Sequence, residues 1–397
     1  MRGETMAPAT IPFRGSPAPT IGVEMELQLV DAESGALVNA CDRLLAEVPP
    51  GWATCFKPEL FQSNLEINTG VCATVDEAEQ DLAEKLLLLD RLCRRHGLRL
   101  VSAGTHPFSP PSEQVVTDNP RYHRLLEILQ RPARRLNIFG LHVHIGVASG
   151  EIALGVLNRL VRYLPHLLAL SASSPYWIGE DTGLASMRVK VFESLSTAGL
   201  PFYFRSWREF ETIIDQLQRS RTIETIRDVW WDIRPHPDFG TVEVRVCDPL
   251  PSLPDTLALV ALIQCLVARA ARQHVEGEPE IKPHAAIARE NKWRAARFGL
   301  GCEIIRADTL ENVPAPALIE EEVAALAPYG RELGCAGHLA RAALLARAGS
   351  SADFQRRVHR ETGSLEAVVR ALADRFAATL AREAEAVAGD PPGPGRE

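Results

Sequence analysis

Two carboxylates stand close together in the stretch IGVEMELQLV, which runs from Ile21 to Val30. Glu24 and Glu26 alternate with apolar residues, and alternation with a period of two predicts a β-strand whose carboxylates share one face. The rise along a strand separates them by about 7 Å, so they repel each other unless water screens them or a cation joins them. For one strand alone, a solvated face is the common explanation.

Four further segments show the same alternation of polar and apolar residues. Their polar faces are rich in Glu, Asp, His, Asn and Arg and lack Lys, whereas an ordinary solvated face would mix in Lys, Ser, Thr and Gln. This composition favours the wall of a cavity, with the apolar positions turned the other way. The polar positions are Glu66 in NLEINTG, His142 and His144 in LHVHIGV, Asp232 and Arg234 in WWDIRP, and Glu243 and Arg245 in TVEVRVCD.

If these strands form one antiparallel sheet, their carboxylate oxygens are hard ligands suited to Mg²⁺ or Mn²⁺. A bound cation would then explain how Glu24 and Glu26 tolerate each other. A single histidine is more often structural than a ligand, and His144, central in its strand, is the better candidate of the two. Zinc held by His142, His144 and a carboxylate stays open, although no H-E-x-x-H helix is present.

The elements that must position these residues are mixed strands and helices without a βαβ rhythm. Further strands are expected at Leu98–Gly104, Ile138–Val147, Val229–Pro235 and Gly240–Asp248. A capping box that begins at Thr74 predicts a helix that ends near Gly97. The chain after Pro249 is mostly helical and closes with an amphipathic helix. Strands first and helices later indicate an α+β fold.

Composition narrows the class of protein. The 397 residues are 46% hydrophobic and 24% charged, which is enough to bury a large core. The net charge of −8 and the pI near 5.8 argue against nucleic acid as a partner. The first twenty residues lack the apolar core of a secretory signal, so a cytoplasmic location is expected. The apolar run from Thr256 is shorter than a membrane span and is predicted to be a buried helix.

Seven segments, in order, resemble the carboxylate-amine ligases of the type 2 glutamate-cysteine ligase family. The resemblance covers roughly Ile21 to Gly301. It implies an antiparallel sheet curved into a funnel and backed by helices, similar to glutamine synthetase and the guanidino kinases, together with ATP and Mg²⁺, or Mn²⁺ in its place. A single catalytic domain is expected at 19–388, between a flexible arm at 1–18 and a flexible tail at 389–397. The segments are GVEMEL, ELFQSNLEI, AGTHPF, LHVHIGV, SASSPYWIGEDTGLASMR, WWDIRPHPDFGTVEVRVCD and ENKWRAARFGL.

The resemblance also assigns roles to single residues. It makes Arg245 a basic residue beside the metal wall, and it places Arg188 in a loop where a bidentate contact could hold a substrate carboxylate. The segment ENKWRAARFGL is expected to form a helix that binds the anionic cofactor, with a solvated basic face as the alternative. Two departures from the family pattern are Met25, which alternation turns away from the cavity, and Ser196, where relatives commonly have Pro. The expected metal and phosphate wall is Glu24, Glu26, Glu66, His144 and Glu243, and the expected cofactor-binding residues are Lys292, Arg294 and Arg297.

The leading hypothesis is an ATP-dependent ligase that joins the γ-carboxylate of L-glutamate to L-cysteine or another small amine. A carboxylate condenses with an amine only after its oxygen becomes a leaving group, which an acyl phosphate provides. A phosphotransferase acting on a guanidino or carboxylate group is the alternative, and a non-catalytic binding module is a third possibility that the complete set of site residues disfavours. The sequence leaves the amine and the formation of a homo-oligomer open.

Overall fold

The fold was analysed in a computed structural model, which describes residues 10–389. The strands of the main sheet are β1 (Ile21–Asp31), β2 (Phe56–Pro58), β3 (Asn64–Asn68), β4 (Leu98–Val101), β5 (Leu141–Gly146), β10 (Ile233–His236) and β11 (Thr241–Cys247). Short strand pairs are formed by β6 (Tyr176–Trp177) with β7 (Glu180–Asp181), β8 (Ala198–Gly199) with β9 (Trp230–Trp231), and β12 (Glu303–Ile305) with β13 (Asn312–Pro314).

The helices surround this sheet and carry most of the second half of the chain. They are α1 (Cys41–Leu45), α2 (Val75–Arg95), α3 (Pro120–Leu129), α4 (Gly150–Leu160), α5 (Leu164–Ser171), α6 (Met187–Phe192), α7 (Trp207–Arg219), α8 (Leu253–Val275), α9 (Ala285–Phe298), α10 (Ala315–Glu332), α11 (Ala336–Ala348), α12 (Ser351–Thr362) and α13 (Leu365–Gly389).

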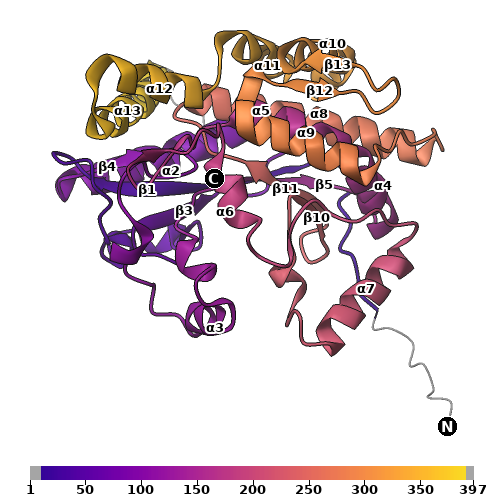
Figure 1. Cartoon of the computed structure of the whole chain (residues 1–397), viewed down its shortest axis with the longest axis horizontal. Coiled ribbons are helices and arrows are strands. Elements are labelled where there is room, and N and C mark those ends of the chain that lie inside the picture. Colours follow the sequence, from indigo (N-terminus) through magenta and orange to yellow (C-terminus); the bar gives the residue numbers. More distant parts are fainter. Residues whose placement is uncertain (1–9, 390–397) are drawn as a thin grey trace.

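The main sheet has seven strands in the order β10-β11-β5-β1-β3-β2, with β4 also paired to β1, and every pairing is antiparallel. Figure 1 shows α8 and α9 on one side of this sheet and α3 and α7 on the other. The expected α+β architecture, an antiparallel sheet backed by helices, is therefore confirmed.

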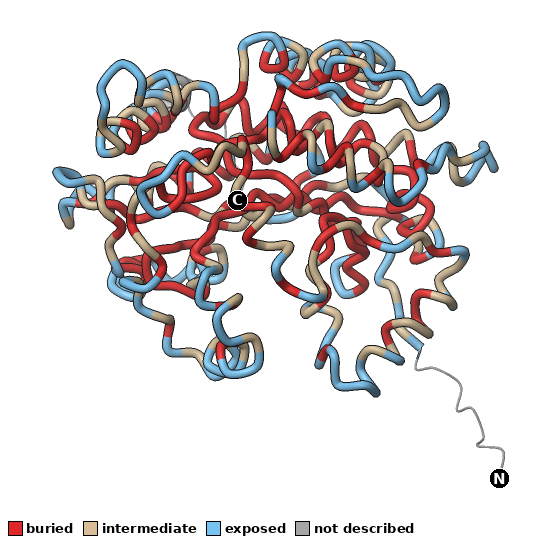
Figure 2. The backbone as a smooth tube through the Cα atoms, viewed as in Figure 1, coloured by how far each residue is buried: buried red, intermediate tan, exposed pale blue. Residues whose placement is uncertain are grey.

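Alternation along the strands decides which face meets the helices. Val23, Met25 and Leu27 of β1 are at most 1% exposed and belong to the main hydrophobic core. Figure 2 shows buried backbone along the sheet and the helices that face it, while the turns around α3 and α7 are largely exposed. The side chains between these apolar residues, Glu24 and Glu26, consequently point to the face opposite the core.

Helix α8 is the central helix of the core. It has 23 residues and is the one helix in the described part of the chain that is long and apolar enough to cross a membrane, yet 83% of its apolar window is buried inside the fold. Ser252 caps its N-terminus by accepting a hydrogen bond from the Asp255 N–H at 3.3 Å. The prediction of a buried helix is confirmed. The reason differs from the one that the sequence suggested, because α8 is long enough to cross a membrane and its burial is what identifies it as a core helix.

The segment 10–18 differs from the loose arm that its composition predicts. The Phe13 ring meets Trp207 edge to face at 5.5 Å, and the Arg14 N–H donates to the Pro237 carbonyl at 2.9 Å. Gly240 has φ +67°, and a Cβ there would lie 1.7 Å from the Arg14 oxygen, so only glycine permits this approach. Residues 1–9 of the predicted arm, and residues 390–397 of the predicted tail, lie outside the described residues.

Candidate active site

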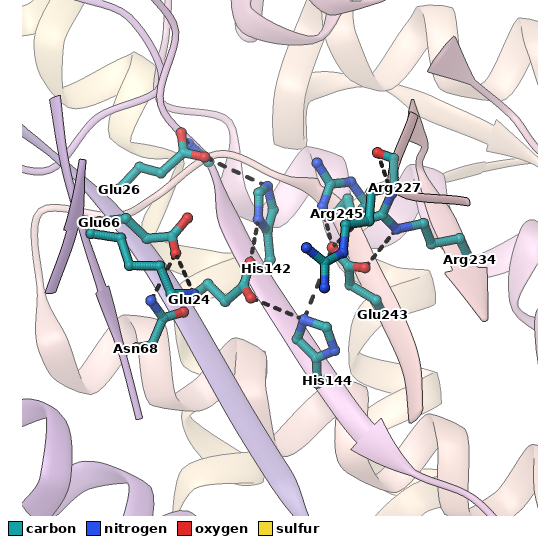
Figure 3. A network of polar contacts seen from close by, with 12 residues as sticks. Glu24, Glu26, Glu66, Asn68, His142, His144, Arg227, Arg234, Glu243 and Arg245 are labelled. Carbon is teal, nitrogen blue, oxygen red and sulfur yellow. Dashed lines mark hydrogen bonds and ion pairs between the residues drawn. The ribbon is translucent and has the colours of Figure 1, made fainter. Parts of the chain in front are cut away.

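The pairing of the strands in the main sheet brings the polar side chains together on one face. Residues at paired positions on antiparallel strands point the same way and have Cβ atoms about 5 Å apart. β1 therefore lies between β5, with its histidines, and β3, with Glu66 (Figure 3). Paired positions form three rows, which are Arg234, Glu243 and His144; His142, Glu24 and Asn68; and Glu26, Glu66 and Lys57.

One group of potential metal ligands consists of Glu24, His142 and Glu243, whose ligand atoms lie within 4.8 Å of one another. His142 Nδ1 lies 3.1 Å from Glu24 Oε2. His144 joins the group through Nε2, which is 3.4 Å from Glu24 Oε1 and 4.0 Å from Glu243 Oε1. The sequence preferred His144 to His142 as the ligand, whereas the structure brings both rings to the same carboxylates.

The ionisation of this first group suits a cation. Burial, reinforced by Arg245, lowers the pKa of His142 to about 4, so the ring is neutral. Burial alone would raise the pKa of Glu24, but contacts with His142 and His144 outweigh it and lower that pKa well below its ordinary value. A neutral imidazole that donates from Nδ1 to Glu24 keeps a lone pair on Nε2, and this atom lies 4.0 Å from Glu26 Oε1.

A second group consists of Glu26, Glu59 and Glu66, whose ligand oxygens also lie within 4.8 Å of one another. Lys57 contacts Glu66 at 3.3 Å, and the Gly140 N–H donates to Glu26 Oε2 at 2.6 Å. Burial and repulsion from the neighbouring carboxylates raise the pKa values of Glu59 and Glu66, and burial raises that of Glu26 to about 7. Buried carboxylates that repel one another in this way accommodate negative charge best when a cation joins them.

Two arginines hold Glu243 in place. Arg234 donates from Nε to Glu243 Oε2 at 2.6 Å, and Arg245 contacts Glu243 Oε1. Burial would raise the pKa of Glu243, but these guanidinium groups lower it well below its usual range. As the sequence predicts, Arg245 and Glu243 lie on the same face of one strand and are in contact. Arg234, on the neighbouring strand β10, is the second arginine that binds Glu243.

Arg188 also reaches this site, by way of an irregularity in β11. The register between β11 and β5 shifts between Val244 and Cys247, and such bulges redirect the backbone. Arg188 donates to the carbonyl oxygens of Val246 and Arg245 at 3.4 and 3.2 Å. It lies in the first turn of α6 rather than in the loop that the sequence predicts, and only 3% of it is exposed.

The three residues predicted to bind the cofactor all have partners within the protein. α9 forms as expected, but Lys292 is buried in contact with Asp232 at 2.5 Å and Glu193 at 2.6 Å. Arg294 donates to Asn312 Oδ1 at 2.5 Å, and Arg297 donates to the carbonyl of Gly183. None of the three lines the cavity in front of the carboxylates. Each contacts an acceptor on another segment of the chain, and the sequence of α9 alone does not indicate these partners.

The carboxylate groups open into a cavity of about 500 Å³, a volume typical of small-molecule sites. Basic and aromatic side chains line it together with the carboxylates. Its polar lining includes Glu24, Glu26, Glu59, Glu66, His142, Arg188, Arg234 and Arg245.

Sequence reasoning missed Glu59 and ranked His142 second. Glu59 follows β2 and belongs to no strand or helix, so no periodicity marks the direction of its side chain. It is, however, the first residue of ELFQSNLEI, one of the segments that carried the family resemblance. That segment was the available signal for Glu59, whereas the pairing of His142 with Glu24 required the strand register.

The raised pKa of Glu26 predicts how stability depends on pH. With a pKa of about 7 in the folded protein against 4.5 ordinarily, Glu26 loses its proton more readily when the chain unfolds. Its contribution to stability is therefore full below about pH 4.5 and is lost as the pH rises to about 7. In chelator-treated protein, Glu26→Gln should gain on the order of 2 kcal/mol in free energy of unfolding over wild type between pH 5 and pH 8, as measured with urea.

Added Mg²⁺ supplies the control for this prediction. A cation binds the carboxylate and competes with the proton, so Mg²⁺ should stabilise wild type more at pH 8 than at pH 6. A difference between the two proteins that does not change with pH would show that Glu26 titrates normally.

Solved structures share this fold. A crystal structure of a glutamate–cysteine ligase from Francisella tularensis in complex with AMP superposes with a TM-score of 0.61 and 16% identity, covering 96% of this chain and 97% of that chain. A bifunctional glutathione synthetase from Pasteurella multocida superposes with a TM-score of 0.64 and 15% identity, covering 91% of this chain and 52% of the larger protein.

The family match gives the class of protein, a ligase similar to the glutamate–cysteine ligases. The chain belongs to glutamate-cysteine ligase family 2 (GCS2), whose family model matches residues 20–371. A relative from Gloeobacter violaceus, named "Putative glutamate--cysteine ligase 2", is 47% identical over 362 residues, which cover 91% of this chain and 97% of the relative. A relative from Frankia casuarinae is also 47% identical, over 89% of this chain and 94% of its own length.

Proposed function

We propose that this protein uses ATP to join the γ-carboxylate of L-glutamate to an amine, L-cysteine or another small amine, through an acyl phosphate. The observation that carries the proposal is that two groups of carboxylates and three arginines meet at one cavity. Membership of the family and the AMP in the Francisella tularensis relative support nucleotide use.

The arginines have separable tasks in this reaction. Transfer of a phosphoryl group needs neutralised charge and in-line positioning more than a protein nucleophile. Arg245, fixed by Glu243, is placed to hold transferring phosphate. Arg188, whose guanidinium is held by backbone carbonyls, presents a rigid fork to the α-carboxylate of glutamate.

The donor set fits Mg²⁺ or Mn²⁺, since it consists of carboxylate oxygens together with neutral imidazole. Glu24, His142 and Glu243 would hold one ion, with His144 beside them, and Glu26, Glu59 and Glu66 would hold another. When bound, such ions neutralise the phosphate charge that develops during transfer. The chain's own residues orient the substrates and keep the acidic wall in register.

Trapping with hydroxylamine tests the order of events. If the acyl phosphate forms first, ATP, Mg²⁺ and glutamate without acceptor should yield γ-glutamyl hydroxamate at a rate comparable to amide formation. A colorimetric hydroxamate assay measures the product, and ADP release against a panel of amines identifies the acceptor.

Omitting glutamate is the control for the trapping experiment. Amide formation in the complete mixture without any hydroxamate would contradict the acyl phosphate. ADP release that depends on the donor but on no amine, without hydrolysis of an acyl phosphate, would instead indicate a phosphotransferase.

A further inference from the structure

A second groove adjoins the catalytic cavity on the side of α3. It has a volume of about 660 Å³ and is lined by α3 together with parts of 196–197 and 218–230. Arg121, Leu125, Arg227 and Trp230 line both spaces, so the groove and the cavity are continuous. No strand of the main sheet contributes to its lining, and α3 lies on the side of the sheet away from α8 and α9 (Figure 1). We call this space the α3 groove.

The glutamates that line the two connected spaces differ in position from the arginines of the α3 groove. The ionisable lining of the groove has an excess of positive charge, whereas Glu24, Glu26, Glu59 and Glu66 line the cavity and not the groove, beside the arginines of the cavity. A molecule with an amine at one end and an anionic group at the other would therefore be oriented with the amine toward the sheet. The ionisable residues of the groove are Arg121, Arg124, Arg221, Arg227, Glu224 and Asp228.

Two of these arginines are available to a ligand. In the described chain the Arg227 guanidinium has no ion-pair partner, and its backbone carbonyl accepts from Arg234 at 3.1 Å, which fixes the residue at the junction. Arg121 faces Asp228 at 3.8 Å, and the Arg121 side chain is 57% exposed, so this pair is weak. Asp228 keeps hydrogen bonds from the N–H groups of Glu224 and Thr225, both 3.0 Å, when Arg121 turns away.

An apolar surface lies next to these arginines. Leu125 and Trp230 are at the junction with the cavity, and Ile128 is 64% exposed on the lining of the groove. A ligand with an apolar side chain would bury this surface, at about 25 cal/mol per Å² removed from water. Cysteine has a smaller apolar side chain than leucine or phenylalanine and would bury less of this surface.

We propose that the α3 groove binds the amine acceptor, and that the acceptor is an amino acid or short peptide with a free carboxylate and an apolar side chain. The inference rests on the proposed function. Arg121 and Arg227 bind the carboxylate, Leu125 and Trp230 contact the side chain, and the amine points to the cavity. The amine attacks the acyl carbon, the C–N bond forms as the bond from that carbon to the phosphate oxygen breaks, phosphate leaves with the electron pair, and the nitrogen releases a proton.

Matched acceptors test this inference in the full-length enzyme with ATP, Mg²⁺ and glutamate. L-leucine and L-phenylalanine are compared with 3-methylbutylamine and 2-phenylethylamine, which lack only the carboxylate. Each amino acid should show kcat/KM at least tenfold above that of its amine and above that of cysteine. Arg121→Ala should raise KM for leucine at least tenfold while KM for ATP and for glutamate changes less than twofold.

Hydroxylamine separates a local effect from misfolding, because so small an acceptor does not need the α3 groove. In Arg121→Ala, the rate of hydroxamate formation should fall at least tenfold less than the kcat/KM for leucine falls. Arg131→Ala, on an exposed arginine beyond the end of α3 that lines neither space, should retain wild-type leucine kinetics.

Three results would overturn the inference. An increase in KM for ATP equal to that for leucine would make the groove a nucleotide site, and equal use of amino acids and their decarboxylated amines would remove the carboxylate contact. Unchanged leucine kinetics in Arg121→Ala would remove the acceptor from the groove. If wild type forms neither hydroxamate nor amide, both the proposed function and this inference are wrong. If wild type forms hydroxamate and any of the three results is obtained, only the inference about the α3 groove is wrong.

Discussion

Glu24→Gln is expected to lower kcat by about a hundredfold or more while the free energy of unfolding changes by less than about 1 kcal/mol. The charge is lost at the residue that contacts both histidines and completes the first group of ligands. Stability should survive, because the amide oxygen can still accept from His142 Nδ1. ADP release at saturating substrates measures kcat, and urea unfolding measures stability.

Two companion variants separate the metal wall from the scaffold. Glu243→Gln should lose activity and also on the order of 3 kcal/mol of stability, because Arg234 and Arg245 would be left buried without their full counter-charge. Glu209→Gln, on α7 and outside both ligand groups, should behave as wild type, since the amide oxygen can still accept the Arg205 N–H. Normal turnover in Glu24→Gln would show that the wall does not carry the chemistry.

The acidic wall was predictable because it depends on a local rule. In a strand, alternate side chains share a face, so the separation of Glu24 and Glu26 from Val23 and Met25 follows from their positions alone. The burial of Val23 and Met25 and the gathering of the glutamates agree with that rule. Helix α2 likewise begins after Thr74 as its capping residues predict, with the Glu77 N–H donating to Thr74 Oγ1 at 3.1 Å.

The rest of the site depends on contacts between distant segments. His142 meets Glu24 across 118 positions of the chain, and which strands become neighbours is not encoded in the period of either. The contacts of Lys292 could not be predicted for the same reason. Its helix was predictable, but its engagement with Asp232 and Glu193 depends on tertiary packing that no local pattern specifies.

Arg188 and Arg245 should lose different kinetic properties when each is replaced by lysine. Arg188→Lys is expected to raise KM for glutamate at least tenfold and KM for ATP little, because Arg188 lines the cavity and a guanidinium can bind a substrate carboxylate through two N–H groups. A lysine cannot serve that carboxylate and the carbonyls of Arg245 and Val246 at once. Arg245→Lys should instead lower kcat at least tenfold, since it shares Glu243 with the metal wall.

Steady-state kinetics with glutamate and ATP varied in turn distinguish these roles. Arg188 lies in the first turn of α6 and contacts the backbone at the bulge of β11. Arg245 lies close to Glu243 and Glu24, which outweigh the burial of its charge and raise its pKa. Lysine keeps one positive charge at either position, so any loss reports the geometry of the guanidinium rather than the net charge of the cavity. The opposite pattern would exchange the two roles, and normal glutamate kinetics in Arg188→Lys would remove α6 from the donor site.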